Sequence, residues 1–327
     1  MVRIVSLLLL VSQVGCDTSL DGYWMSWKTE FNKKYSSPNE EACRRAIWQE
    51  NVLEATKHNT EAAAGRRTFT MGTNHLSDMT PEEINRRLNG LRGENIAHHD
   101  ANKSFLFLTD FSVPYHVDWV TKGLVSPVQN QGMCGSCWAF SAIGSLEAQM
   151  KKKSGRLVPL SAQNLVDCSV KDGNHGCKGG FISKAFSYIQ QNNGIDSAWY
   201  YPYEAREGSC RYSSENKAGH CTGFWILPRN ESVLRLAVAA VGPVSVGINA
   251  KLPSFHRYKS GIYYDPLCDS RAVNHAVLVV GYGKENGLDY WLIKNSWGTA
   301  WGENGYFRLA QNRNHCGIAN FAIVPKV

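Results

Sequence analysis

The sequence has no long apolar run after its first residues, and this excludes a chain that spans a membrane. A membrane-spanning helix needs about 20 apolar residues, whereas the run at residues 4–11 is far shorter and no later segment approaches that length. Preceded by Arg3, this short run is typical of a cleaved secretory signal peptide. We expect that peptide to cover residues 1–16.

Internal repeats and low-complexity tracts are also absent, and only 19% of the 327 residues are charged. These features exclude a repeat array and a disordered chain. The length, together with a hydrophobic content of 43%, allows a sizeable core and more than one folding unit.

A concentrated basic surface is missing, although the net charge is +7. Residues 17–112 carry 12 Lys and Arg against 14 Asp and Glu, and residues 113–327 carry 22 against 14, so their net charges are −2 and +8. The one compact basic cluster, residues 151–153, precedes Ser154 and Gly155 and suits the C-terminus of a helix. The charge therefore indicates no nucleic-acid partner.

Cysteine is plentiful, with ten residues. In an exported chain this number indicates disulfides rather than a metal site, so we expect neither metal nor cofactor. Eight of the cysteines lie in residues 113–327, which is too many for their pairing to be derived from sequence. Asn102 and Asn230 begin triplets that fit the N-glycosylation pattern.

The first third of the chain has helix signals. Four aromatic residues recur every three or four positions and predict one apolar helix face: Trp24, Trp27, Phe31 and Tyr35. Ser37, Pro38 and Glu40 supply a cap, a first-turn proline and a reciprocal acid for a helix running towards His58. The same device at Thr80, Pro81 and Glu83 predicts a third helix.

From Val113 the pattern changes, and residues 113–327 read as two lobes of an α+β protein. A helical lobe is expected mainly over residues 125–220, with helices beginning at Cys137 and Ser161. A β lobe, β-barrel-like in form, is expected mainly over residues 221–327. Its strands are predicted at residues 242–248, 276–282, 290–294 and 305–309. A cleft between the lobes would bring together residues that are far apart in sequence.

Three residues of these lobes can form a nucleophilic site. Cys137 ends the sequence Cys-Gly-Ser-Cys, His275 follows 138 residues later, and Asn295 precedes Ser296 and Trp297. Singly, each has a structural explanation, as a buried thiol, a satisfied imidazole or a turn residue. Together, with Gln131 six residues before Cys137, the set resembles the active site of papain-like cysteine proteases. Over nearly its whole length the chain resembles their cathepsin L-like subfamily, the group of cathepsins S, K and L.

The chemistry needs these residue types. A cysteine attacks a peptide carbonyl as thiolate, and the N-terminus of a helix plus the imidazolium of His275 would lower the pKa of Cys137. Asn295 would accept a hydrogen bond from the other imidazole nitrogen and orient the ring. The resemblance implies that Trp297, a residue of the substrate-binding site, shields this hydrogen bond from water. It also implies that the side-chain amide of Gln131 donates a hydrogen bond to the oxyanion.

The resemblance also implies the substrate-binding residues. Gly179 and Gly180 would offer backbone hydrogen bonds to an extended peptide. The main specificity pocket would be lined by Phe181, Gly247, Val273, Ala276 and Phe321. An apolar pocket narrowed by Ala276 favours Leu or Val over aromatic side chains at P2, two positions before the scissile bond. No segment resembles an occluding loop, which favours endopeptidase action.

The implied disulfides are Cys134–Cys177, Cys168–Cys210 and Cys268–Cys316, with Cys221 and Cys43 left as thiols. The resemblance further implies an inhibitory prosegment over residues 17–112, lying through the cleft against the substrate direction, and a mature enzyme over residues 113–327. Two prosegment motifs support this, with Ala55, Trp48 and Leu76 departing from the usual residues. Their members are Glu41, Arg45, Trp48, Asn51 and Asn59, then Gly72, Asn74, Leu76 and Asp78.

Acid is expected to release the prosegment. As the pH falls, its carboxylates lose charge and four histidines become cationic, so its attraction to the positive mature part weakens: His58, His75, His98 and His99. Asp78 could be a specific switch or a plain surface or turn acid. The implied partners are protein and peptide substrates and cystatin-type inhibitors, for a monomer in lysosomes or secreted.

Other functions need other features. A catalytically inactive relative that acts as an inhibitor would usually lack the nucleophile, which is present here. A disulfide-stapled binding module would be a short chain. A transglutaminase-like site would place an acid where this chain has Asn295.

Overall fold

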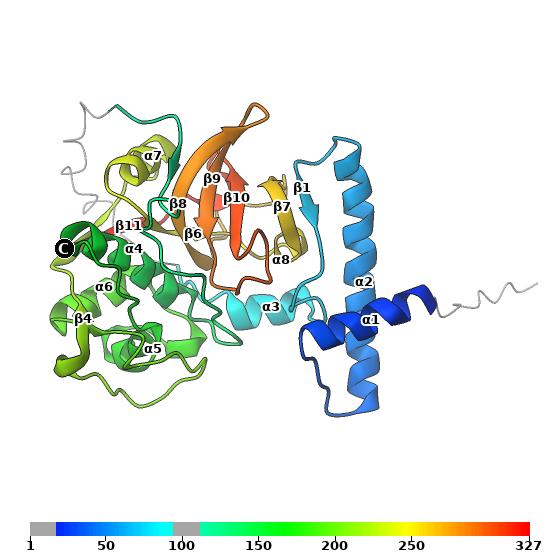
Figure 1. The fold of residues 1–327 in the computed structure, drawn as a ribbon, viewed down its shortest axis with the longest axis horizontal. Coiled ribbons are helices and arrows are strands. Elements are labelled where there is room, and N and C mark those ends of the chain that lie inside the picture. Colours follow the sequence, from blue (N-terminus) through cyan, green and yellow to red (C-terminus); the bar gives the residue numbers. More distant parts are fainter. Residues whose placement is uncertain (1–17, 94–111) are drawn as a thin grey trace, which may run out of the picture.

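The computed structural model describes residues 18–93 and 112–327. The expected signal peptide, Asn102, His98 and His99 lie outside these residues. Three helices of the N-terminal part flank one end of a large sheet, and a second group of helices forms the other lobe (Figure 1). Within the described residues no helix has the length and apolarity that crossing a membrane requires.

Two of the three N-terminal helices, α2 and α3, begin where their caps predict. The three helices are α1 (Thr18–Glu30), α2 (Pro38–Ala63) and α3 (Pro81–Leu88). Ser37 caps α2, but the Glu40 carboxylate accepts from Ser36 and not from the capping residue. At α3 the reciprocal capping box of Thr80 and Glu83 is complete.

The predicted aromatic face of the first helix is only partly helical. Asn32 adopts a left-handed φ of 48° just after α1 ends at Glu30, so Phe31 and Tyr35 lie beyond the helix. They still pack on the buried cluster of Trp24, Trp27 and Trp48. The rings of Trp24 and Trp27 are stacked 5.3 Å apart. The spacing therefore predicted the cluster correctly and the helix end wrongly.

The helical lobe is built on a buried helix that starts at the predicted nucleophile. It contains α4 (Cys137–Ser154), α5 (Ala162–Cys168) and α6 (Ile182–Gln191), with a small sheet of β3 (Ile195–Asp196) and β4 (Lys217–Gly219). Gly155 ends α4 in a left-handed conformation directly after the lysine cluster, as expected. Lys152 donates from Nζ to the Val241 carbonyl at 2.6 Å.

The β lobe is a long, mostly antiparallel sheet. Its strands run in the order β1-β7-β10-β9-β8-β6-β11-β5, and β2 pairs with β8. The bounds are β1 (Phe69–Met71), β2 (Val117–Asp118), β5 (Gly223–Ile226), β6 (Val244–Ile248), β7 (Tyr258–Tyr263), β8 (His275–Glu285), β9 (Leu288–Lys294), β10 (Tyr306–Ala310) and β11 (Ala322–Lys326). Helices α7 (Glu231–Ala240) and α8 (Pro253–His256) complete the lobe, and exposed Asn230 caps α7. The four predicted strands are all present.

The N-terminal part shares its core with the β lobe. Strand β1 forms one edge of the sheet, antiparallel to β7 (Figure 1). Phe69, Met71, Ile84 and Leu88 belong to the same buried apolar cluster as the β-lobe residues. Burial of this size stabilises docking, because each buried large side chain contributes about 1.5–3 kcal/mol.

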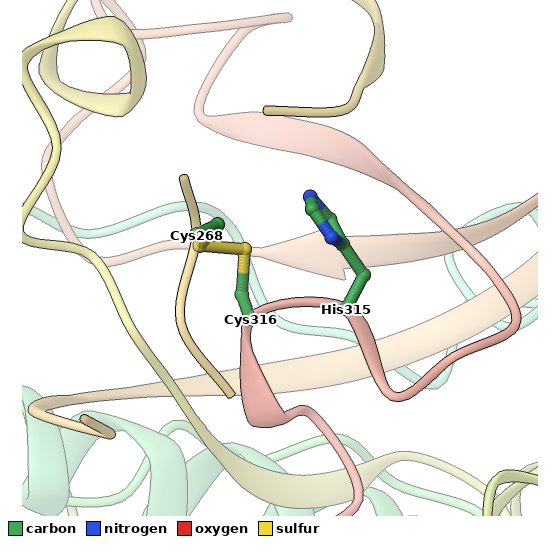
Figure 2. Close-up of side chains that lie close together, drawn as sticks. All are labelled: Cys268, His315 and Cys316. Carbon is green, nitrogen blue, oxygen red and sulfur yellow. A yellow bond between two sulfur atoms is a disulfide. The ribbon is translucent and has the colours of Figure 1, made fainter. Parts of the chain in front are cut away.

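Three disulfides connect the described cysteines in the expected pairs: Cys134–Cys177, Cys168–Cys210 and Cys268–Cys316. Among the described cysteines, Cys43 is an exposed thiol, and Cys137 and Cys221 are buried thiols. His315 lies beside Cys268 and Cys316 (Figure 2), an arrangement that resembles a metal site. Because both sulfurs are used in the disulfide, they are not available as thiolate ligands.

Candidate active site

Helix α4 and strand β8 bring the predicted nucleophile and base together. Cys137 is fully buried at the first position of α4. Its Sγ accepts a hydrogen bond from the backbone N–H of Ala276 at 3.4 Å, and Ala276 is the second residue of β8. His275 is the first, so the sulfur lies at the strand end that carries the imidazole.

The imidazole of His275 is oriented by the residue after β9. Its Nε2 donates to Asn295 Oδ1 at 2.8 Å, and the same oxygen accepts from the Ser296 N–H at 2.8 Å. The Trp297 ring lies 4.8 Å from the His275 ring and is fully buried. The hydrogen bond between His275 and Asn295 is therefore shielded from water, as expected.

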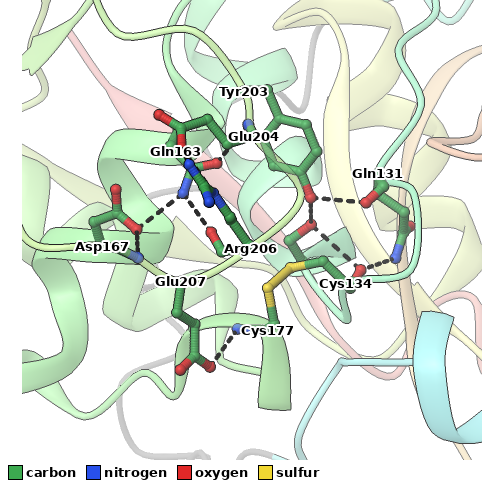
Figure 3. Close-up of a disulfide and its surroundings, with 12 residues drawn as sticks. Gln131, Cys134, Gln163, Asp167, Cys177, Tyr203, Glu204, Arg206 and Glu207 are labelled. Carbon is green, nitrogen blue, oxygen red and sulfur yellow. Dashed lines mark hydrogen bonds and ion pairs between the residues drawn. A yellow bond between two sulfur atoms is a disulfide. The ribbon is translucent and has the colours of Figure 1, made fainter.

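Gln131 is held on all sides next to the nucleophile. Its backbone N–H donates to the Ser296 carbonyl, and its side-chain Oε1 accepts from Ser296 Oγ at 2.6 Å. Figure 3 shows its Nε2 donating to the Cys134 carbonyl and its own carbonyl accepting from Tyr203. Because Oε1 is occupied by Ser296, Nε2 is the part of the side chain that is left to donate to other groups.

The loop that carries Cys134 is tied to the helical lobe. The Cys134–Cys177 disulfide joins it to the segment before Gly179, and Glu207 accepts from the Cys177 N–H at 3.0 Å (Figure 3). The Tyr203 hydroxyl also bonds Ser136 Oγ, the residue that precedes the nucleophile, at 2.5 Å. These contacts hold the loop and the start of α4 in one position.

A short part of the prosegment, residues 88–92, runs between the two lobes. We call the boundary between the lobes the cleft. Gly90 accepts from Gly180 N at 2.9 Å, Arg92 N donates to the Gly180 carbonyl at 3.0 Å, and Leu91 N donates to the Asn274 carbonyl at 3.0 Å. The Leu88 carbonyl accepts from Gln131 Nε2 at 2.9 Å. Leu91 pairs with Gly180 in the parallel sense.

Glycine is required where the backbone of the prosegment meets the backbone of the helical lobe. A Cβ on Gly90 would lie 1.8 Å from the Gly135 carbonyl oxygen, and a Cβ on Gly179 would lie 2.5 Å from the Gly90 carbonyl oxygen. Gly179 also has a φ of 104°, which side chains rarely adopt. The backbones can therefore approach closely only without side chains.

Leu91 occupies the predicted specificity pocket. A methyl group on Gly247 would come within 2.6 Å of both Leu91 Cδ2 and Val273 Cγ1, and within 3.5 Å of Phe321 Cβ. Leu91 and Ala276 belong to one buried cluster, against which Val273 packs. Phe181 follows the two glycines at the start of α6. Leu91 therefore lies against Gly247, which Val273 and Phe321 also approach.

Comparisons with known proteins agree with this geometry. Residues 113–326 match the papain family of cysteine proteases, and residues 24–84 match the cathepsin propeptide inhibitor domain. The chain belongs to the papain family. It is 50% identical to cathepsin S of Bos taurus over 320 residues, which cover 97% of this chain and 96% of that protein. It is 48% identical to cathepsin K of Mus musculus over 310 residues, covering 94% of each.

Solved proenzymes have the same fold. A digestive procathepsin L2 proteinase from the Tenebrio molitor larval midgut superposes with a TM-score of 0.89 at 42% identity, covering 94% of this chain and 100% of that one. A recombinant stem bromelain precursor gives a TM-score of 0.84 at 34% identity, covering 94% and 99%. This papain-family chain is therefore a cathepsin-like cysteine protease with its propeptide, and the described form is the zymogen.

In this zymogen the catalytic charges are suppressed. Burial raises the pKa of Cys137 to about 11, although backbone N–H groups, including those of Gly90 and Leu91, favour the thiolate. Burial lowers the pKa of His275 to about 4, outweighing the bonds to Asn295 and Leu88 that favour the cation. The low thiol pKa expected of the open site stays a prediction, because both groups are buried in this form.

The prosegment histidines also differ from expectation. Burial lowers the pKa of His75 to about 4, with Lys33 adding to the effect and Asp78 opposing it. Burial lowers the pKa of His58 as well. While docked, His75 therefore stays neutral over the mildly acidic range in which free histidines gain charge.

Some residues that occupy the cleft or hold the prosegment were not predicted from the sequence. Leu88, Gly90 and Leu91 occupy the cleft, yet they follow α3 without a motif of their own. A possible signal was the glycine just after a capped helix, which allows close backbone approach. Arg257 was also missed. It is a buried cation of the β lobe that pairs with prosegment Glu54.

Proposed function

We propose that the chain is the zymogen of a lysosomal or secreted cysteine endopeptidase that works through a Cys137 thiolate and a His275 imidazolium. The contact that carries this proposal is the Leu88 carbonyl on Gln131 Nε2, in front of the buried Cys137. It supports a site built to receive a peptide carbonyl at the nucleophile. The implied partners are peptide and protein substrates and cystatin-type inhibitors of a monomeric enzyme.

In the reaction, the proton of Cys137 moves to His275 once the prosegment leaves and water returns. The sulfur then attacks the substrate carbonyl carbon, and the oxyanion accepts hydrogen bonds from Gln131 Nε2 and the Cys137 N–H. His275 gives its proton to the leaving amine as the C–N bond breaks, which leaves an acyl-enzyme. Water, activated by the neutral imidazole, hydrolyses the thioester and restores the thiol.

The pocket predicts the P2 preference. Because Leu91 fills the space bounded by Gly247, Val273 and Phe321, we expect kcat/KM for peptides with Leu or Val at P2 to exceed that for Phe by about tenfold. A peptide panel varied only at P2, with the acid-processed enzyme, measures this. Ala276→Gly should widen the pocket and raise the relative rate for Phe. A clear advantage for Phe in the unaltered enzyme would contradict the proposal.

The zymogen boundaries follow from the same proposal. We place the prosegment at residues 17–112 and the enzyme at residues 113–327, and the family match that starts at residue 113 supports this. The Pro114 carbonyl accepts from the Tyr282 hydroxyl at 3.0 Å, and β2 pairs with β8. These anchors favour processing before Pro114. N-terminal sequencing of acid-treated zymogen tests the boundary.

Asp78 is proposed as one acid-sensitive contact of the prosegment. It is almost fully buried and accepts from Lys33 Nζ at 2.7 Å and from the Tyr35 hydroxyl at 2.9 Å. Its protonation would leave the Lys33 ammonium without its ion-pair partner.

Replacing Asp78 by Asn should imitate this protonation. We expect the pH midpoint of self-processing to rise by about half a unit, since a lost ion pair of a partly exposed lysine has a moderate effect. Processing rates from pH 4 to 7 measure it. Glu61→Asn is the matched control, because Glu61 pairs with Arg66 at the surface. A pH profile identical to that of the unaltered zymogen would rule out the Asp78 switch.

A further inference from the structure

The prosegment covers the open edge of the main sheet. Phe69, Thr70 and Met71 of β1 stand opposite Gly261, Ser260 and Tyr258 of β7. The ladder continues at both ends, because Ile262 N donates to the Thr68 carbonyl and Gly72 N donates to the Arg257 carbonyl, both at 2.8 Å. On the described sheet β7 has β10 on its other side. Removal of the prosegment therefore leaves β7 as an edge strand.

Arg257, just before β7, depends on the prosegment for its side-chain partners. Its Nη1 donates to Asn51 Oδ1 at 2.5 Å, and its Nη2 forms an ion pair with Glu54. Arg257 is only 4% exposed in the zymogen. Removing α2 takes away the cover and both partners, so the processed enzyme presents a cation at the start of an unpaired strand.

The same edge has an apolar surface. The Phe69 ring lies 4.9 Å from the Tyr263 ring and 6.3 Å from the Tyr258 ring, and Met71 is also buried. An edge strand with apolar pockets at alternate positions is the usual acceptor for an added strand. Arg257, whose partners Asn51 and Glu54 lie on α2 beside β1, favours an added segment that brings a carboxylate next to the strand.

The path of the prosegment relates this edge to the cleft. Leu91 occupies the specificity pocket and Leu88 contacts Gln131, so the chain runs from the acyl side towards the leaving-group side as residue numbers fall. It then continues through α3 to β1, which Figure 1 shows beside β7. The 17 positions from Met71 to Leu88 connect the β7 edge to the cleft. A substrate bound in the opposite sense would have its C-terminal side directed to β7.

We propose that the β7 edge with Arg257 is, in the processed enzyme, a docking site for an extended segment that follows the scissile bond of a protein substrate and carries an acidic side chain for Arg257. This proposal rests on the proposed function, because the prosegment must leave and the cleft must cleave peptides. A docked segment raises the effective concentration of the scissile bond at the cleft. It selects protein substrates by a feature that short peptides lack.

The test uses the acid-processed enzyme and two fluorogenic substrates with the same cleavable core and Leu at P2. One is the core alone. The other continues after the scissile bond through a Gly/Ser linker to a copy of residues 50–72, which lacks the cleft-binding residues 88–92. The linker is about 40 residues long, because it joins the copy at residue 50 and not at residue 72. We expect kcat/KM to be about tenfold higher for the tethered substrate, through a lower KM. Equal values for the two substrates would overturn the proposal.

Variants on both sides identify the contacts. Tethers with Ser at the positions of Phe69 and Met71, or Gln at those of Glu50 and Glu54, should lose most of the advantage. Arg257→Gln in the enzyme should reduce it to about threefold, whereas Lys284→Gln, with the same loss of charge on the β8–β9 hairpin, should keep it. An equal loss in both enzyme variants would indicate general charge attraction and overturn the role of Arg257.

A binding measurement separates this proposal from the proposed function. Fluorescence anisotropy of a labelled peptide of residues 50–72 reports docking on the processed enzyme without any turnover. Binding that Arg257→Gln weakens at least threefold supports the docking site, even if the core substrate were not cleaved. Cleavage of the core without peptide binding would leave the protease intact and overturn the docking site.

Discussion

Replacing Cys137 by Ala is expected to lower kcat/KM of the processed enzyme by about 10⁵-fold or more, because losing a protease nucleophile removes covalent catalysis entirely. In the same variant, zymogen incubated in acid should stay unprocessed if processing is autocatalytic. Hydrolysis of a peptide with Leu at P2, normalised by titration with an epoxide-type thiol inhibitor, measures the effect. Because this variant is not expected to process itself, its mature form for the rate measurement is prepared by treating the zymogen with a small amount of unaltered, active enzyme.

The chain supplies its own control for this experiment. Cys221 is also a buried thiol, but its Sγ contacts the Phe186 carbonyl at 3.5 Å, whereas the Sγ of Cys137 contacts Ala276, the neighbour of His275. Burial raises the pKa of the Cys221 thiol to about 11, and we expect this thiol to stay protonated in the mature enzyme as well. Cys221→Ala should therefore keep both turnover and inhibitor labelling. Labelling that persists in Cys137→Ala and disappears in Cys221→Ala would contradict the assignment.

Local signals predicted the elements that carry the site. Ser37 with Pro38 and Thr80 with Pro81 mark helix starts, because a capping side chain and a first-turn proline act within a few residues. The strand at residues 276–282 was predicted from its own apolar run. Cys137 and His275 could be paired only through the family resemblance, since no local rule relates residues 138 positions apart.

Features of the structure that depend on contact between distant segments could not be predicted from the sequence. The helix α1 stops before Phe31 because Asn32 turns the chain, although the aromatic spacing continues. The short strand β1 exists because β7 offers it an edge, and three residues alone have no strand signal. The pKa values of Cys137 and His275 depend on prosegment residues that exclude water from the cleft.

Arg257 illustrates the same limit for charge. From sequence it is one of many basic residues, and the net charges of the two segments suggested a diffuse attraction. In the structure, attraction is local, with buried Arg257 on buried Asn51 and on Glu54, whose side chain is half exposed. Lys33 and Asp78 form a similar contact inside the prosegment. Acid sensitivity is therefore expected from a few groups and not from the overall charge.

His75 is the group for which the structure predicts the largest pH effect on the prosegment. It lies by the Phe31 ring at 6.4 Å and lines a groove with Trp297 and Gly298, where prosegment and enzyme meet. The charged groups that face it are Lys33, which disfavours its cation, and Asp78, which favours it. Burial dominates, so the docked ring has a pKa of about 4 against 6.5 for a free histidine.

The sign follows from proton binding. Between pH 6.5 and 4 the released prosegment binds a proton at His75 and the docked one does not, so docking weakens as the pH falls. The difference of about 2.5 pH units corresponds to about 3 kcal/mol, which is present in full above pH 6.5 and lost progressively towards pH 4. A difference of about 2.5 pH units corresponds to a factor of about 300, so a single histidine can weaken docking by about that factor once the pH falls below 4.

His75→Phe should remove this weakening, because phenylalanine keeps the ring and cannot take a proton. We expect the midpoint of acid processing to fall by about one pH unit, and acid-induced release in a Cys137→Ala background, followed by tryptophan fluorescence, to shift in the same direction. His116→Phe, at an exposed histidine of the enzyme, should leave both midpoints unchanged. If His75→Phe zymogen were processed and released at the same pH as the unaltered protein, protonation of His75 would not contribute to activation.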